Sequence, residues 1–201
     1  MSLQAFSSSF INKFIYLKRA FGNQPFRLLD IGAGNHSATK VKRVFPQCEY
    51  HGVDLERDYN NNEEDFKRMT AFYEMDLTQL DFSPIPDNYY DAIVMAHVIE
   101  HLHNGDAVIR GLLPKLKSGG YMYLEYPGEK STRLPSMRGS LNFKDDPTHV
   151  RVYSVQELAA LFSAYQCTVL KGGTRRNGWF IAAMPFRIVA SWLQGKKLQG
   201  N

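Results

Sequence analysis

The stretch LLDIGAGNH (Leu28–His36) decides the fold of this 201-residue chain. Apolar residues that lead into two closely spaced glycines, Gly32 and Gly34, are typical of a buried strand that turns tightly and brings its backbone against a ligand. The stretch does not match the G-x-G-x-x-G pattern of dinucleotide folds, because Ser37 stands where the third glycine belongs. The carboxylate of Asp30 would repel a pyrophosphate and suits a ligand with an amino group. Taken alone, the stretch also fits a plain structural turn.

Short apolar runs alternate with helical patterns around this stretch. Unbroken apolar runs predict strands that are covered on both faces, and apolar residues three or four apart predict helices. Such alternation predicts an α/β fold with a Rossmann-like, doubly wound and mostly parallel sheet. The predicted strands are Arg27–Ile31, Glu49–Leu55, Phe72–Leu77, Tyr90–Ala96, Tyr121–Tyr126, Cys167–Leu170 and Gly178–Met184. The predicted helices are Ser2–Phe21, Ser37–Phe45, Asp106–Leu116, Ser154–Phe162 and Phe186–Leu193.

A long segment without a regular pattern follows Pro127. A loop of such length after a strand serves function more often than structure. It ends at Ser154, which begins a helix, and Glu157 three residues later completes a capping box. We expect a helical cap over residues 1–24 and one domain over residues 25–201.

The composition fits a globular protein of ordinary kind, since 44% of the residues are apolar and 22% are charged. A net charge of +4 is too mild to imply a nucleic-acid partner, which stays open but is not favoured. Cys48 and Cys167 form no metal-spaced pair, which favours a reducing compartment. No apolar run approaches the roughly 18 residues that span a bilayer. We therefore expect a cytoplasmic protein without a transmembrane segment.

Two further acids stand at the ends of predicted strands. Asp54 ends the second strand, where a carboxylate can accept hydrogen bonds from both hydroxyls of a ribose. Asp76 ends the third strand, where it can accept from an adenine amino group while Leu77 packs on the ring. Each acid alone fits a solvated strand end. Together with Asp30 they indicate a nucleoside-like ligand, because ligands of open α/β sheets bind beyond the carboxyl ends of the strands.

These motifs, in this order, resemble the class I S-adenosylmethionine-dependent methyltransferases over about residues 27–184. Two further blocks carry the resemblance. They are YDAIVMAHVIEHL (Tyr90–Leu102), which is similar to the fourth-strand block of the family, and LLPKLKSGG (Leu112–Gly120), which is similar to its approach to the fifth strand. The resemblance implies a seven-stranded sheet whose last strand is antiparallel, and S-adenosylmethionine as cofactor.

The resemblance also implies a role for each motif. Asp30 and the Gly32-Ala33-Gly34 turn would surround the amino-acid part of the cofactor. Asp54, with Leu55 beside it, would bind the ribose. The remaining cofactor contacts would come from Asp76 and Leu77 on the adenine and from Ala96 and His97 beside the methyl group. In one departure, this chain has His36 where many members have a further glycine.

The acceptor is open. The chain has no Asn-Pro-Pro-Tyr stretch after the fourth strand, which weakens a base or amide methylase, and no suitably placed cysteine for a cytosine methylase. The loop Asn142–His149 resembles that of enzymes of cell-surface sugar or lipid assembly. We expect a small-molecule acceptor that is methylated on oxygen. The alternatives are an RNA 2′-O-methyltransferase and a non-catalytic binding protein of the same fold.

Three histidines are candidates for the base that removes the acceptor's proton. His97 and His101, four residues apart, would share one face of a helix with Glu100. His149 follows the long loop, where Asp145 and Asp146 would orient its ring, and is the base we expect. Glu100, His101 and His149 also resemble the Mg-binding set of a small-RNA 2′-O-methyltransferase family. We expect no metal, because Mg²⁺ prefers oxygen ligands.

Overall fold

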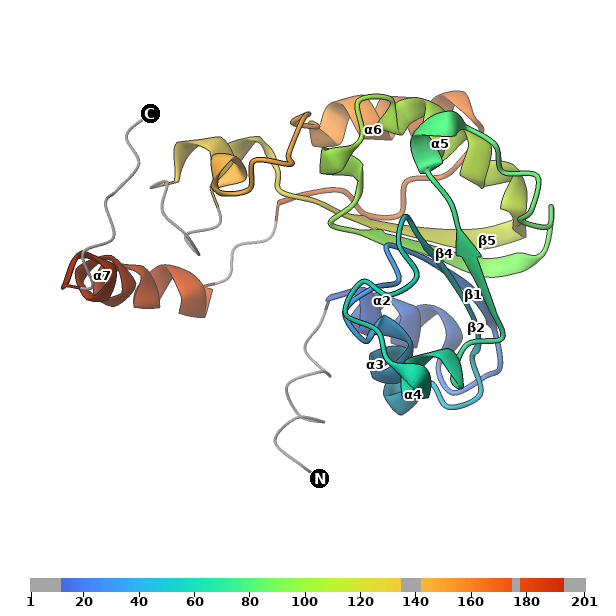
Figure 1. The fold of residues 1–201 in the computed structure, drawn as a ribbon. Coiled ribbons are helices and arrows are strands. Elements are labelled where there is room, and N and C mark those ends of the chain that lie inside the picture. Colours follow the sequence, from blue (N-terminus) through green and yellow to red (C-terminus); the bar gives the residue numbers. More distant parts are fainter. Residues whose placement is uncertain (1–11, 135–141, 175–177, 194–201) are drawn as a thin grey trace. The chain divides into compact units, whose positions relative to one another are not determined.

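The computed structural model describes residues 12–134, 142–174 and 178–193. Its centre is a sheet of five strands, all paired in parallel, in the order β3-β2-β1-β4-β5 (Figure 1). The strands are β1 (Arg27–Ile31), β2 (Glu49–Asp54), β3 (Ala71–Glu74), β4 (Tyr90–Ala96) and β5 (Leu116–Glu125). The order reverses between β1 and β4. The predicted doubly wound α/β fold is therefore confirmed.

Helices and short 3₁₀ turns connect the strands. The α-helices are α2 (Asn12–Phe21), α3 (Ser37–Val44), α4 (Glu63–Phe66), α5 (Gly105–Leu112), α6 (Val155–Ala164) and α7 (Gly178–Leu193). The 3₁₀ turns are Leu77–Gln79, Ile99–His101, Leu113–Lys115, Glu129–Arg133 and Phe143–Asp145. The chain divides into two compact units, one of Met1–Ile99 with Asn104–Glu125 and one of Glu100–His103 with Tyr126–Asn201. The first unit contains the whole sheet.

The core of the first unit lies between the sheet and the helices α2 and α3, which cover one of its faces while α5 covers the other (Figure 1). The α2 side chains Phe14 and Leu17 are fully buried there, as the helical spacing predicts. Phe26, just before β1, stacks on Phe21 with ring centroids 4.4 Å apart and meets Phe45 edge-on at 5.4 Å. These aromatic contacts fix the two helices against the start of the sheet.

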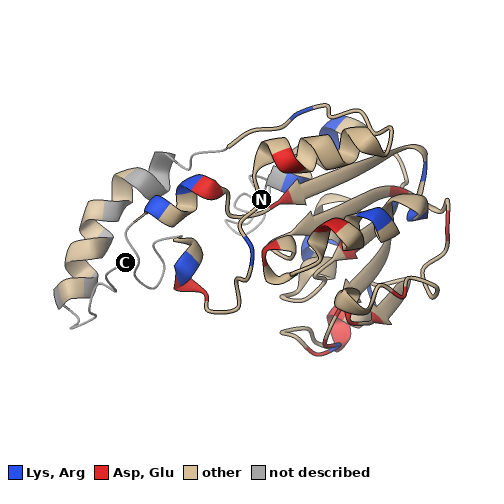
Figure 2. Cartoon of the chain, turned by 90° about the horizontal axis from the view of Figure 1, so that it is seen from above, with Lys and Arg blue, Asp and Glu red and all other residues tan. Residues whose placement is uncertain are grey.

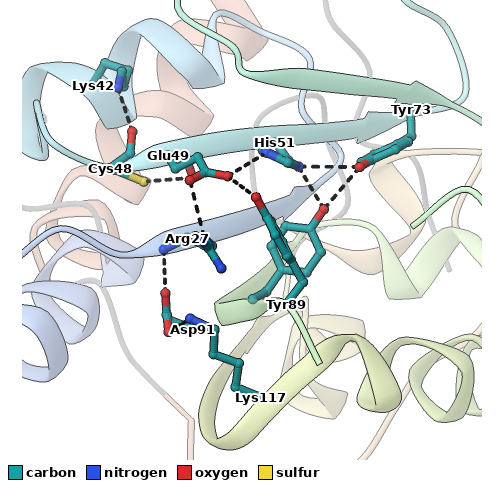
Figure 3. Close-up of polar contacts among 10 residues, drawn as sticks. Arg27, Lys42, Cys48, Glu49, His51, Tyr73, Tyr89, Asp91 and Lys117 are labelled. Carbon is teal, nitrogen blue, oxygen red and sulfur yellow. Dashed lines mark hydrogen bonds and ion pairs between the residues drawn. The ribbon is translucent and has the colours of Figure 1, made fainter. Parts of the chain in front are cut away.

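A polar network joins the amino ends of the strands (Figure 3). Glu49 of β2 accepts a hydrogen bond from the Tyr89 hydroxyl at 2.5 Å and one from the Arg27 guanidinium at 3.3 Å. The guanidinium also lies 4.2 Å from the centroid of the Tyr89 ring. His51 lies 2.8 Å from the Tyr90 hydroxyl, and burial lowers the pKa of its imidazole. Because ligands of such sheets bind at the opposite, carboxyl edge, we read this network as structural.

The two last predicted strands are wrong. Cys167–Leu170 forms no strand, and Leu170 is 75% exposed. Gly178–Met184 lies in α7, which continues through Pro185 to Leu193. A short apolar run does not distinguish a strand from a helix, and here the run continues as a helix through Pro185. The described residues thus contain five parallel strands in place of the expected seven with an antiparallel last one. No described helix has the length and apolar content to cross a membrane.

The other boundaries differ by a few residues. The helix predicted at Ser2–Phe21 is described only from Asn12, and its first residues lie outside the described part. Strand β5 begins at Leu116, five residues earlier than predicted, and its pairing with β4 shifts register between Tyr90 and Ala92. The Ser154–Glu157 capping box is confirmed, since the Glu157 N–H donates to the Ser154 hydroxyl at 3.0 Å.

The packing of α5 generates a stability prediction. A Cβ at Gly111 would lie 2.2 Å from the ring of Phe82, which is 8% exposed. We expect Gly111→Ala to lower the free energy of unfolding by about 1–3 kcal/mol through overpacking, although alanine favours helices. Urea denaturation measures this change. Gly128→Ala, with open space at its Cβ, is the matched control and should unfold with nearly the free energy of the wild type. Equal free energies of unfolding for the two variants would contradict the close packing of Gly111 on Phe82.

Candidate cofactor and catalytic sites

The glycine turn lies where the strand order reverses, which is the usual ligand site of such sheets. The N–H groups of Gly32 and Ala33 both donate to the carbonyl of Val53 in β2, at 2.8 and 3.0 Å. Gly32 has a φ of +79°, and a Cβ there would lie 2.5 Å from Val98. The turn therefore requires glycine at Gly32 for both its backbone conformation and its close packing.

The structure brings together Gly34 and Asp54, two of the residues that the sequence suggests for the cofactor. One carboxylate oxygen of Asp54 accepts from the Gly34 N–H at 2.8 Å, and the other accepts from the Leu55 N–H at 2.8 Å. Burial raises the pKa of this half-buried carboxyl. A carboxylate has about four acceptor positions, so the two hydrogen bonds from Gly34 and Leu55 do not exhaust its capacity to accept from the hydroxyls of a ligand. The position therefore fits a ribose.

Asp30 is only 1% exposed and faces the interior. Its carboxylate accepts hydrogen bonds from the Ser37 hydroxyl at 2.5 Å and the Tyr50 hydroxyl at 2.9 Å, and pairs with the Lys13 ammonium at 3.3 Å. Lys13 thus provides the positive charge that the sequence suggested would come from a ligand. This arrangement favours a role for Asp30 in positioning the turn and α3 over direct contact with the cofactor.

The segment after β2 packs on the glycine turn, and the sequence did not reveal this. The carbonyl of Tyr59 accepts from the Asn35 N–H at 3.0 Å, and the Asn61 amide donates to the Ala33 carbonyl at 3.2 Å. The ring of Tyr59 lies where a side chain at Gly34 would stand. The segment is polar and lacks any helical or strand period, so no pattern in it predicts these contacts.

His36, at the position where many family members have glycine, has a left-handed backbone with a φ of +57°. That conformation explains the preference for glycine. In this chain the ring of His36 lies 2.6 Å from the carboxylate of Asp65 in α4. The backbone N–H of His36 donates to the Asn61 side chain at 3.1 Å. These contacts hold the start of α3 in place without the glycine.

The third predicted acid, Asp76, does not end a strand, because the observed strand is shorter than predicted. Strand β3 ends at Glu74, and Asp76 caps the following 3₁₀ turn by accepting from the N–H and hydroxyl of Thr78 at 2.9 and 2.6 Å. These hydrogen bonds hold the pKa of Asp76 below its ordinary value. Leu77 is buried beside it. The exposed Asp76 carboxylate and the apolar Leu77 retain the character expected of an adenine site.

Ala96 ends β4, and His97 follows it with a φ of +57° and a side chain 62% exposed. Its N–H donates to the carbonyl of Glu125 at the end of β5, at 2.8 Å. The expectation that His97 and His101 share a helix face is wrong, because only a 3₁₀ turn, Ile99–His101, follows and His97 lies outside it. A left-handed residue cannot continue a right-handed helix.

The second unit brings His149 to the adjacent pair Glu100 and His101, which lie 48 or more residues earlier in the sequence. The backbone of Glu100 accepts from the Val150 N–H at 2.8 Å, and this contact holds the loop against the turn. The rings of His101 and His149 lie 4.8 Å apart, and the Glu100 side chain is 1% exposed. Of the two predicted orienting acids, Asp145 closes a capping box with Asn142, and Asp146 lies beside the ring of His149.

Hydrogen bonds select the proton-bearing nitrogen of each ring. Nδ1 of His149 lies 2.6 Å from the carbonyl of Phe143, which can only accept, so Nδ1 carries a proton. The Thr148 hydroxyl donates a hydrogen bond to Asp146 at 2.5 Å, so its oxygen accepts one from Nδ1 of His101 at 2.9 Å. Both Nε2 atoms are then the nitrogens left for chemistry. Nε2 of His149 lies 3.9 Å from Asp146 and 4.0 Å from Glu100.

The same three residues are the metal-binding candidates within the described part of the chain. One ligand atom from each of Glu100, His101 and His149 lies within 4.8 Å of the others. Two imidazoles and a carboxylate suit Zn²⁺ or Mn²⁺ better than Mg²⁺, which prefers oxygen. The geometry allows either a base at His149 or a metal.

Comparison with known proteins identifies the family. Residues 6–171 match a family model described as a methyltransferase domain. The chain is 27% identical over 156 residues to the uncharacterized methyltransferase YcgJ of Bacillus subtilis (strain 168), an alignment that covers 76% of this chain and 61% of YcgJ. The chain thus spans less than two thirds of the length of that relative.

Solved structures show the same fold. YcgJ superposes with a TM-score of 0.55 at 23% identity, over 76% of this chain and 67% of that one. An S-adenosylmethionine-dependent methyltransferase from Archaeoglobus fulgidus gives 0.53 at 20% identity, over 89% and 85%. Phosphoethanolamine N-methyltransferase 2 of Haemonchus contortus, solved with S-adenosylhomocysteine, gives 0.57 at 18% identity, over 76% and 36%. This chain belongs to the methyltransferase domain family.

Proposed function

We propose that the chain transfers a methyl group to an oxygen atom of a small-molecule acceptor, with His149 as the base. The observation that carries this proposal is the setting of His149, whose Nδ1 proton is held by a backbone carbonyl while Nε2 faces two carboxylates. A precursor of a cell-surface sugar or lipid is the acceptor class that we favour, from the Asn142–His149 loop.

The cofactor supplies a methyl group that its sulfonium already activates. Asp54 binds the ribose hydroxyls, with Leu55 beside it, and the Gly32–Gly34 turn lets the backbone approach the amino-acid part. Asp76 and Leu77 bind the adenine, and Ala96 and His97 line the methyl end.

His149 then completes the chemistry. The acceptor oxygen forms a bond to the methyl carbon as the carbon–sulfur bond breaks, and Nε2 of His149 takes the hydroxyl proton. Glu100 and Asp146 stabilise the imidazolium that results, as carboxylates do beside catalytic histidines. His101, in ring contact with His149, orients that ring and is the second candidate for the base, followed by His97.

An RNA 2′-O-methyltransferase, in which Glu100, His101 and His149 bind a metal, is the second candidate function. The clustering of their ligand atoms favours it, together with the basic balance of the chain. The two functions differ in their dependence on a metal and in their affinity for RNA.

The ribose role of Asp54 predicts that Asp54→Ala weakens binding of S-adenosylhomocysteine by about 1–3 kcal/mol, because two hydroxyls lose a charged acceptor. Isothermal titration calorimetry measures the affinity, and thermal unfolding verifies that the variant is folded. Asp81→Ala removes an exposed acid of the same unit and should bind as the wild type does. Unchanged affinity in Asp54→Ala would exclude the ribose role.

The base role predicts that His149→Ala lowers turnover by roughly 10²–10⁴-fold and leaves the affinity for S-adenosylhomocysteine unchanged. A labelled-methyl assay over sugar, phenol and RNA extracts measures turnover. His103→Ala, at an exposed histidine of the same unit, is the control and should retain activity. Wild-type activity should survive EDTA. Activity that disappears with EDTA and returns with Zn²⁺ or Mn²⁺ would make His149 a ligand.

A small-molecule acceptor predicts no tight binding to RNA. If RNA is the acceptor, its affinity must fall steeply as salt rises, because phosphate counterions are released on binding. Fluorescence anisotropy with labelled RNA 3′ ends, at salt concentrations from about 50 to about 300 mM, measures this dependence. Tight, salt-sensitive binding would favour the second candidate function over the first.

A further inference from the structure

Helix α7 exposes large apolar side chains. Phe186 is 78% exposed, Val189 is 55% exposed and Trp192 is 73% exposed. Their spacing of three residues places them on one broad side of the helix. Among the 16 residues of α7 the sequence has one charged residue, Arg187. A helix so apolar is normally buried in a protein or in lipid, so its exposed side requires a covering partner.

Exposed apolar surface is concentrated in this part of the chain. Of the ten large apolar side chains that are exposed in the described residues, six follow residue 164. These six are Tyr165, Val169, Leu170, Phe186, Val189 and Trp192. Scattered apolar side chains are ordinary on a protein surface, but three of them along one helix, Phe186, Val189 and Trp192, indicate an interaction.

The charge of the same segment indicates the chemistry of the partner. No Asp or Glu follows Glu157, whereas six Lys or Arg do. The first 157 residues carry a formal charge of −2 and the remaining 44 carry +6, against +4 for the whole chain. In Figure 2 the described part of α7 carries no acidic residue. Basic pairs flank the helix in the sequence, at Arg175-Arg176 and at Lys196-Lys197.

We propose that α7 docks on the surface of an anionic phospholipid bilayer. Its apolar side would enter the boundary between headgroups and acyl chains, and the flanking basic pairs would attract anionic headgroups. Trp179 and Trp192 stand at the second and fifteenth positions of the helix, and tryptophan favours the interfacial zone. A helix of 16 residues is about 24 Å long, short of the roughly 30 Å of a bilayer core, so it lies in the interface.

Other occupants fit these features less well. A second copy of the chain would bring two segments of charge +6 together, and like charges repel. RNA would neutralise the basic residues but would leave Phe186, Val189 and Trp192 uncovered. A bilayer with anionic lipids covers the apolar side and neutralises the charge at once.

The fluorescence of the chain reports on this helix alone, because Trp179 and Trp192 are its only tryptophans and both lie in α7. Vesicles of phosphatidylcholine with about 30% phosphatidylglycerol should shift the tryptophan emission of the full chain to shorter wavelength. Lipids brominated on their acyl chains should quench it. Vesicles of phosphatidylcholine alone should give a much smaller shift. The measurement needs no cofactor or acceptor, so its outcome is separate from that of the methyl-transfer proposal.

Two variants keep both tryptophans. Phe186→Ser with Val189→Ser should abolish the shift on anionic vesicles, and Lys196→Gln with Lys197→Gln should weaken binding to anionic vesicles only. Leu80→Asn removes an exposed apolar side chain of the first unit and should bind as the wild type does. An unchanged spectrum with vesicles would overturn the proposal, as would a shift that appears without lipid as protein concentration rises. A shift produced by RNA and not by vesicles would overturn it as well.

Discussion

A buried carboxylate, Asp30, ties the first unit together. A buried charge costs several kcal/mol unless it is paired and hydrogen-bonded. Here the donors come from three different elements, Lys13 of α2, Ser37 of α3 and Tyr50 of β2. The charge is therefore satisfied only when both helices are packed on the sheet. The glycine turn begins two residues after Asp30 and ends three residues before Ser37, so the same pairing fixes both ends of the turn.

The glycine turn also depends on the neighbouring strand, β2. Carbonyl and carboxylate groups of β2, from Val53 and Asp54, accept the N–H groups of Gly32, Ala33 and Gly34. The backbone of the turn is thus satisfied by its neighbour before any ligand arrives, which lowers the cost of ordering a binding site. The residues proposed to bind the cofactor all belong to the first unit, at or after the carboxyl ends of its strands.

The second unit contains the candidate catalytic or metal-binding residues and an exposed apolar helix. It contains the cluster of Glu100, His101 and His149, and it contains α7 with its exposed apolar side. An acceptor that is a lipid or a lipid-linked sugar would connect the two features, because such an acceptor is itself found at a bilayer. A first unit proposed to bind the cofactor and a second unit proposed to act on the acceptor would be consistent with a family in which a common cofactor fold serves many acceptors.

The sequence by itself determined the doubly wound fold, the approximate positions of the first five strands along the chain, the glycine turn and the carboxylate at Asp54. These features have strong local signals, because buried parallel strands are apolar without interruption and a tight turn requires glycine. Tertiary structure alone decided that Asp30 faces the interior and that Tyr59 and Asn61 pack on the turn. Each of these depends on contacts between residues distant in the sequence, which no local period records. The same holds for α7, where an apolar run fits strand and helix equally well until its surroundings are known.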